Sequence, residues 1–299
     1  MSKAGPASEG AIQPIGFLVA LAPDWRVSRV SANIGEHLGK SPADLLGRSI
    51  TSLFAEEAVH SLRNRLALLR SPDSVERLFS VPLSGGTSVF DVALHMSGNT
   101  AVLEAEPSRD QRHDRDSTGT IRGMIGQLGA IEELTALCAL AARQVRALSG
   151  FDRVVIRRAG DDAAGLPAAE AVRSGARSMT GEPGSSIAGR SILTIVADTS
   201  AAPVAILAPP HARRGLDLSN ALLLAAPQAE LTAMREAGIG AAILLPLIVA
   251  GRRWGDIRCY HRAPSCPSLE RRSAIEWFAM MLSMQIEIRE LRARAEPRS

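Results

Sequence analysis

In the first third of the chain, apolar runs typical of strands are interspersed with stretches of helical spacing. Four short apolar runs have the length and composition of strands, at residues 17–21, 27–30, 89–94 and 101–106. Between them, SPADLLG and AEEAVHSLRNRLALL have apolar positions at helical spacing, and Ser41 and Gly47 are placed to cap the two ends of the first stretch. The pattern predicts an α+β domain over residues 11–106, an antiparallel sheet with flanking helices, after a disordered N-terminus at residues 1–10.

A second α+β unit follows a segment that lacks apolar periodicity. Residues 107–119, PSRDQRHDRDSTG, are dense in charges of both signs and predict a linker. Beyond it, helical spacing predicts a long amphipathic helix over residues 120–149 and a shorter one near residues 228–237. Strands are predicted in RVVIRR, SILTIVAD, AAILLPLIVAG and RWGDIRCYH. We expect this second domain to cover residues 120–294 and to end in a tail at residues 295–299.

The closing helix of the second domain, residues 268–294, is apolar on two sides. One stripe steps by four, three, four and three residues, which is a heptad seam: Trp277, Met281, Met284, Ile288 and Leu291. A second stripe is placed to face the domain's own sheet: Ile275, Phe278, Leu282 and Ile286. We therefore expect a homodimer in which this helix packs with the helix at residues 120–149 of a second chain. The alternative is one wide core face within a single chain.

Composition limits the class of protein. With 299 residues, 46% of them hydrophobic, the chain is long enough for two domains with real cores. No apolar run approaches the roughly 20 residues needed to span a bilayer, and three widely spaced cysteines fit a reducing compartment, so we expect a cytoplasmic protein without a membrane partner. The net charge of +3 comes mainly from arginines that alternate with acidic residues. This pattern favours solvated surface over nucleic-acid binding.

No arrangement of residues in the sequence indicates catalysis. The run that contains Cys259, His261 and Cys266 lacks a fourth ligand and a standard spacing for metal binding, so we interpret these residues as structural. The glycines of GEPGSSIAG are not followed by the lysine of a phosphate-binding loop. We therefore expect neither an enzyme nor a metal protein.

Five stretches, in chain order, resemble the PAS and GAF domains of bacteriophytochromes: IQPIGFLVAL, VSANIGEHLGKSPADLLGRSI, LSGFDRVVIRR, GLDLSNALLLAAPQAELTAMREAGI and LIVAGRRWGDIRCYHRAPS. The resemblance covers residues 11–290. It implies a PAS domain followed by a GAF domain, and it allows a knot at their junction. It also implies a photoreceptor of sensory transduction that holds a bilin chromophore and dimerises through its GAF helices.

The residues that would hold the bilin depart from the family pattern. The first ten residues contain no cysteine for attachment, and Ala229 takes the place of the cysteine that plant and cyanobacterial relatives use. Ser186 replaces a motif aspartate, Glu230 replaces the histidine beside the ring nitrogens, and Arg157 replaces a pocket tyrosine, whereas His261 stays at a family histidine. The resemblance therefore implies a degenerate remnant pocket with these candidate residues: Ser185, Ser186, Ile187, Glu230, Tyr260, His261 and Arg157.

These departures lead to one expected function and two alternatives. We expect a phytochrome-like PAS–GAF module of the receptor class that has lost covalent bilin binding and carries no cofactor. It would act as a regulatory or protein-interaction module, with a signalling partner protein in trans. The first alternative is a photoreceptor that binds biliverdin or another tetrapyrrole without a covalent bond, with His261 as the surviving polar contact. The second is a GAF sensor of a smaller ligand, with contacts from Arg157, Ser185, Ser186 and Glu230.

Overall fold

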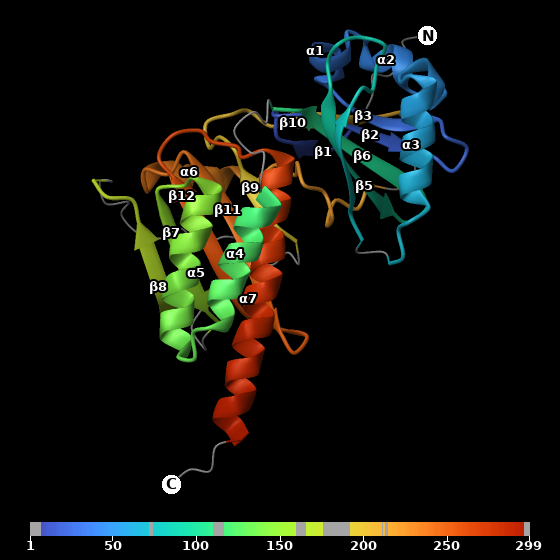
Figure 1. Cartoon of the computed structure of the whole chain (residues 1–299). Coiled ribbons are helices and arrows are strands. Elements are labelled where there is room, and N and C mark those ends of the chain that lie inside the picture. The colour runs from blue at the N-terminus through green and yellow to red at the C-terminus, as the bar shows by residue number, and fades with distance from the viewer. Residues whose placement is uncertain are drawn as a thin grey trace. The chain divides into compact units, whose positions relative to one another are not determined.

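The chain forms two compact units that are not each continuous in sequence. The computed structural model describes residues 7–71, 74–109, 117–159, 166–175, 192–210, 212 and 215–295 (Figure 1). The first unit contains Met1–Arg109 together with Ala201–Ala225, and the second contains Asp110–Ser200 and Ala226–Ser299. The segment Ala201–Ala225, which the sequence pattern placed in the second domain, therefore belongs to the first unit.

The first unit is built on an antiparallel sheet of seven strands, counted over the described residues, in the order β1-β10-β3-β2-β6-β5-β4. Its strands are β1 (Ala7–Ile12), β2 (Phe17–Leu21), β3 (Val27–Ser31), β4 (Glu76–Val81), β5 (Phe90–Ser97), β6 (Thr100–Pro107) and β10 (Val204–Ala208). Its helices are α1 (Ile34–Leu38), α2 (Pro42–Leu45), the 3₁₀ turn η1 (Ile50–Ser52) and α3 (Glu56–Leu66).

Strand β2 is buried on both faces of this sheet. Phe17 and Val19 pack into the larger core cluster, which also contains residues of α1, α2 and α3. Leu18 and Ala20 alternate with them and join a second cluster that includes Leu223. A strand covered on both faces needs apolar residues at every position, which explains the uninterrupted run FLVAL.

The position of strand β10 shows that two predicted boundaries were wrong. It lies between β1 and β3, so the unit contains an inner strand, Val204–Ala208, that follows the end of β6 at Pro107 only after the first part of the second unit. Its partner β1 begins at Ala7, inside the segment that we expected to be disordered. The local sequence pattern did not predict β1 or the place of β10, because the backbone groups of β1 form hydrogen bonds with a strand that is remote in sequence.

The second unit has a five-stranded antiparallel sheet, counted over the described residues, in the order β8-β7-β12-β11-β9. The strands are β7 (Arg153–Arg158), β8 (Leu166–Val172), β9 (Thr194–Val196), β11 (Ala241–Val249) and β12 (Arg252–His261). The helices are α4 (Ser117–Gly129), α5 (Leu134–Ser149), α6 (Gln228–Glu236) and α7 (Leu269–Ala295). Figure 1 shows α4, α5 and α7 packed together, with α5 and α7 against the sheet. The predicted α+β class, with antiparallel sheets and flanking helices, is confirmed.

The long helix predicted over residues 120–149 is in fact two helices. The carboxylate of Glu133 accepts hydrogen bonds from the backbone N–H groups of Thr135 at 2.7 Å and Ala136 at 2.5 Å, and so caps the start of α5. These bonds, first among them that from Thr135, hold the pKa of Glu133 below its usual value. At the other end, Gly150 adopts a φ of 73°, the left-handed conformation that ends a helix with least strain when the residue is glycine.

The predicted linker at residues 107–119 is shorter on both sides than its charge pattern indicated. Strand β6 continues to Pro107, and α4 begins at Ser117. Residues 110–116 lie outside the described part of the chain. Of the helices that the structure describes, none combines the length and the apolar character needed to cross a membrane.

Candidate functional site

One face of the second sheet packs against α6 through an apolar cluster. Its buried members are Val155, Val196, Ala226, Leu231, Met234, Ile239, Ala242, Leu244 and Tyr260. Strand alternation puts Ala242 and Leu244 on this face and Leu245 on the other, where Leu245 lines a groove with Ala279 and Ser283 of α7. The sheet therefore separates the α6 side from the α7 side, and we call the former the α6 face.

Tyr260 is a core residue of the α6 face. It is 1% exposed, and the Arg153 guanidinium lies 5.9 Å from its ring centroid. In this position the only tyrosine of the chain contributes apolar area and a π surface to the packing of α6 on the sheet.

A charged network continues the same face beyond the apolar cluster. Arg258 makes a bidentate pair with Asp256, with Nε to Oδ1 at 2.8 Å and Nη2 to Oδ2 at 3.2 Å. Arg253 Nη2 lies 3.6 Å from Asp256 Oδ2, and Asp256 is the register partner of Arg157 on β7. Burial opposes the charged form of Arg258, but the bonds and charge of Asp256 outweigh it and raise the pKa of Arg258. We call the set Arg157, Arg253, Asp256 and Arg258 the arginine network.

Of the arginine network, Arg157 is the one member that the sequence had pointed to as a candidate. Asp256 and Arg258 are separated by one residue in RWGDIRCYH, and this spacing puts both on one face of a strand. This spacing can be read from the sequence, but it does not show that β7 pairs with β12 at this point. Gly255 allows this close approach, because a Cβ at that position would lie 1.9 Å from the carbonyl oxygen of Arg157.

Glu230 lies in the first turn of α6 and is 6% exposed. A carboxylate at that position is stabilised by the unpaired N–H groups at the start of a helix. Its neighbours Leu231 and Met234 belong to the apolar cluster, so Glu230 and Tyr260 are brought to the same region of the unit. The other three candidates, Ser185, Ser186 and Ile187, lie outside the described residues.

His261 has partners of a different kind from those of the other candidates. Its Nε2 lies 3.7 Å from Asp152 Oδ2, and its ring makes an edge contact with Phe151 at 5.6 Å between centroids. Its Nδ1 lies 2.9 Å from the carbonyl oxygen of Ala263. These contacts fix His261 at the junction of β12 with the start of β7, where it orders the chain that leaves the sheet. No group of three His, Cys, Asp or Glu residues in the described part of the chain is arranged to hold a metal ion.

Helix α7 presents apolar residues on two opposite sides. Ile275, Phe278, Leu282 and Ile286 are fully buried, as the predicted core stripe requires. The exposed large apolar side chains form what we call the outward stripe: Trp277, Met280, Met284, Ile288 and Leu291, which are between 38% and 65% exposed. Met281, which the heptad pattern placed in the seam, is half-buried, and Met280 takes its place in the stripe.

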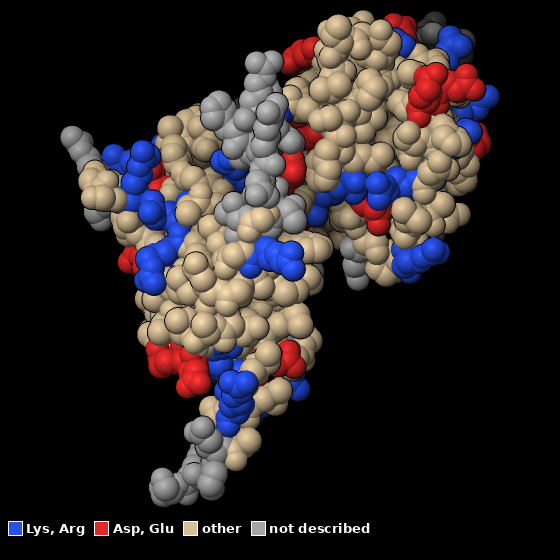
Figure 2. All heavy atoms as spheres, viewed as in Figure 1, with Lys and Arg blue, Asp and Glu red and all other residues tan. Residues whose placement is uncertain are grey.

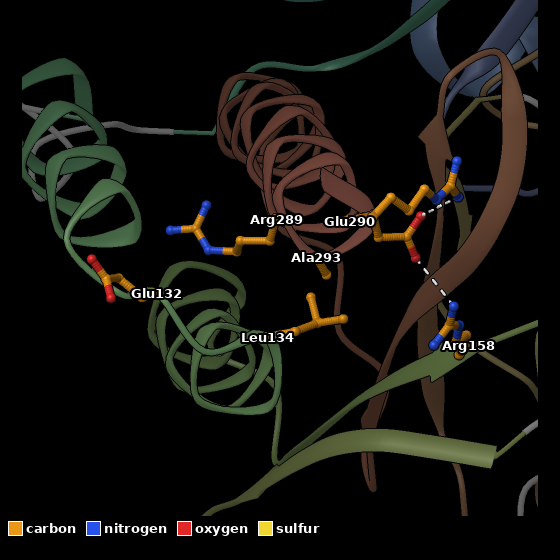
Figure 3. A pocket seen from close by; sticks show the side chains of 7 residues that line it. Glu132, Leu134, Arg158, Arg289, Glu290 and Ala293 are labelled. Carbon is orange, nitrogen blue, oxygen red and sulfur yellow. Dashed lines mark hydrogen bonds and ion pairs between the residues drawn. The ribbon is translucent and has the colours of Figure 1, made fainter. Parts of the chain in front are cut away.

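A cavity of about 380 Å³, lined mostly by charged residues, lies between the start of α5 and the C-terminal part of α7 (Figure 3). It is lined by Glu132, Leu134, Arg158, Arg289, Glu290, Ala293 and Arg294. Arg289 donates through Nε and Nη2 to the carbonyl oxygen of Ile131 and through Nη2 to that of Leu128, and so satisfies the end of α4. Burial, followed by the nearby charge of Arg292, lowers the pKa of Arg289. Because these charges bond one another and the backbone, we interpret the cavity as a structural junction.

Two family models match the chain. The PAS fold matches residues 7–108, and the GAF domain matches residues 133–289. The chain is 28% identical over 93% of its length to the phytochrome-like protein Cph1 of Synechocystis sp., and 26% identical over 93% to a bacteriophytochrome of Pseudomonas aeruginosa. It spans 39% of the length of each of these relatives.

A solved structure is similar over nearly the whole chain. It is the crystal structure of the chromophore-binding domain of RpBphP3, an unusual bacteriophytochrome from R. palustris, with a TM-score of 0.81 and 27% identity. The similarity covers 96% of this chain and 97% of that one. The chain thus belongs to the GAF domain family, and with its PAS fold followed by a GAF domain it is a phytochrome-like PAS–GAF protein.

Proposed function

We propose that the protein is a regulatory module of signal transduction that does not attach a bilin covalently. The observation that carries this proposal is the state of its thiols. Cys138, Cys259 and Cys266 are all buried, and burial raises the pKa of Cys138 to about 11 and that of Cys259 to about 12. A buried neutral thiol is a poor nucleophile, since the thiolate is the reactive form. None of the three stands at a position where the family attaches its chromophore.

The polar residues of the α6 face support the same proposal. Asp256 engages Arg253 and Arg258, and His261 lies beside Asp152. Tyr260 packs in the apolar cluster beneath α6. These groups stabilise the sheet and its connections, so their roles do not require a chromophore.

A second candidate function is non-covalent binding of biliverdin or a related tetrapyrrole. Two observations favour it: the similarity to the chromophore-binding domain of RpBphP3, and the arginine network on the α6 face. Guanidinium groups are suited to the two propionates of a bilin. The network contains three arginines and one aspartate, and the negative charge of such a ligand would partly offset its excess of positive charge.

We propose that the module acts as a homodimer and has no catalytic activity. The outward stripe of α7 supports the dimer, because it lies opposite the buried stripe and exposes five large apolar side chains along one helix side. On the face shown in Figure 2, basic and acidic side chains lie in small groups separated by uncharged surface. This distribution favours a protein partner over nucleic acid or an anionic membrane.

The test is expression in a host that makes heme oxygenase and biliverdin, with the bacteriophytochrome of P. aeruginosa expressed in parallel as a positive control. We expect no zinc-induced bilin fluorescence at the mass of this protein on a denaturing gel, and no red or far-red absorbance band in the purified native protein. A native band that is lost on denaturation would support the non-covalent alternative. A fluorescent band on the gel would contradict both.

A further inference from the structure

The carboxylate of Glu290 ties the end of α7 to two strands of the second sheet. Its Oε1 accepts hydrogen bonds from Trp254 Nε1 at 2.8 Å and from Arg158 Nη2 at 3.1 Å. Its Oε2 lies 3.5 Å from Arg294 Nη2, one turn further along the helix. The Arg158 guanidinium also lies over the Trp254 ring, 5.5 Å from its centroid. Figure 3 shows the Glu290 side chain turned toward Arg158.

Both strands that Glu290 reaches carry the arginine network on their other face. Arg158 directly follows Arg157 on β7. Trp254 precedes Asp256 by two residues on β12, and it is the residue left without a register partner at the β-bulge between Arg253 and Gly255, which puts it on the face opposite Asp256. Successive side chains of a strand point to opposite faces, so a shift of β7 moves Arg157 and Arg158 together. Through Glu290, α7 therefore contacts the two strands that carry the arginine network.

A series of polar contacts on one flank fixes the rotation of α7 about its own axis. Glu276 accepts a hydrogen bond from Leu193 N at 3.2 Å, Ser283 Oγ accepts one from Ile248 N at 3.2 Å, and Glu287 accepts one from Ala250 N at 3.2 Å. Glu290 continues this series, and the spacings of seven, four and three residues put all four on one side of the helix. This flank lies between the buried stripe and the outward stripe.

We propose that Glu290 is a positioning residue that couples the arginine network to the rotational setting of the last turns of α7. The three earlier contacts of the flank reach backbone groups at the edge and hairpin of the sheet. The bonds of Glu290, by contrast, are to side chains of β7 and β12. A ligand or a mutation that displaces these strands thereby changes the direction in which Ile288 and Leu291 of the outward stripe point. This inference concerns a contact within one chain, so it stands whether or not the protein dimerises or binds a bilin.

The first test compares Glu290→Ala and Glu290→Gln with the control Arg292→Gln, which changes an exposed charge of the same helix end outside the polar flank. Hydrogen exchange of the amides at residues 288–295 should be at least tenfold faster in Glu290→Ala, and near the wild-type rate in the control. The indole N–H resonance of Trp254, identified by its loss in Trp254→Phe, should move in Glu290→Ala and move less in Glu290→Gln, which keeps an acceptor oxygen. Unchanged exchange and an unchanged indole resonance in Glu290→Ala would overturn the proposal.

The second test is a double-mutant cycle across the sheet. Asp256→Asn weakens the arginine network and should alter exchange at residues 288–295 in the wild-type background, but not in the Glu290→Ala background, which lacks both acceptor oxygens. Circular dichroism selects variants that stay folded. An effect of Asp256→Asn that is the same in both backgrounds would show that Glu290 supports the helix without coupling it to the network.

Discussion

Glu104 on β6 holds the backbone of Leu223, a residue 119 positions further along the chain, with its Oε1 accepting the Leu223 N–H at 2.7 Å. Its Oε2 accepts the N–H of Leu222 at the same distance and lies 3.9 Å from His95 Nδ1. Glu104 is 2% exposed. One carboxylate therefore accepts hydrogen bonds from two buried N–H groups of the segment Ala201–Ala225, which belongs to the first unit although the sequence placed it in the second domain.

Replacement of Glu104 by alanine should destabilise the first unit. Two buried N–H groups would lose their acceptor, and each such loss costs about 1–3 kcal/mol. We expect the midpoint of thermal unfolding to fall by several degrees, measured by calorimetry, and Glu104→Gln to fall between alanine and wild type because one carbonyl oxygen remains. The exposed Glu57 on α3 provides a control, Glu57→Gln, that should leave the midpoint within about a degree. An equal midpoint for Glu104→Ala and wild type would contradict the anchoring role.

Limited proteolysis should cut first between Arg109 and Arg115, where the sequence is charged and without apolar periodicity. The two fragments should stay together on a sizing column under native conditions. The reason is that β10, on the C-terminal fragment, is an inner strand between β1 and β3 of the N-terminal fragment. Separation of the fragments without denaturant would show that this pairing does not hold the first unit.

Charges placed in the outward stripe should prevent dimerisation without unfolding the protein. Met284 and Ile288 are 53% and 38% exposed, so Met284→Glu with Ile288→Glu leaves the charges in water in a monomer and buries them only in a dimer. The expected cost to association is several kcal/mol, enough to convert a micromolar dimer to monomer in light scattering.

The buried stripe of the same helix provides the contrast for that experiment. Leu282 is fully buried, and Leu282→Ala should lower the free energy of unfolding by about 2–5 kcal/mol, measured by chemical denaturation, because it leaves a cavity in the core. If the double glutamate variant loses stability to a similar degree and its mass equals that of the wild type, the dimer proposal is wrong.

Alkaline pH should destabilise the protein through its buried thiols. Burial raises the pKa of Cys138 from 9.0 to about 11, so the unfolded chain releases this proton at a lower pH than the folded chain. Between pH 9 and 11 the unfolded state therefore binds fewer protons, and stability falls as pH rises. Between pH 8 and 10.5 this thiol should account for a loss of about 2 kcal/mol.

Urea denaturation of the wild type and Cys138→Ala at these two pH values isolates that contribution. The alanine variant keeps a small apolar side chain at the site and should lose less stability over the interval. Cys259 acts in the same direction in both proteins, since burial raises its pKa to about 12. Parallel losses in the two proteins would mean that the Cys138 thiol does not titrate as its burial requires.

The sequence by itself determined those features whose cause is local. The two sides of α7 follow from a period that any helix imposes on side chains a few residues apart, so Phe278 and Leu282 could be placed in the core and Met284 outside it. The α+β class and the order of the two domains were likewise predictable, because runs such as FLVAL and the resemblance of quoted stretches are read directly along the chain.

Only the tertiary structure decided which remote segments meet. Strand β10 lies between β1 and β3, which come from the other half of the chain. Glu104 bonds Leu222 and Leu223, up to 119 positions away, and Glu290 contacts Trp254, 36 positions away. Hydrogen bonds of this kind depend on the register and direction of strands after folding, and a residue's neighbours in sequence do not specify them. Burial of a carboxylate such as Glu104 is favourable only when those remote N–H groups arrive, so its local sequence gives no sign of its role.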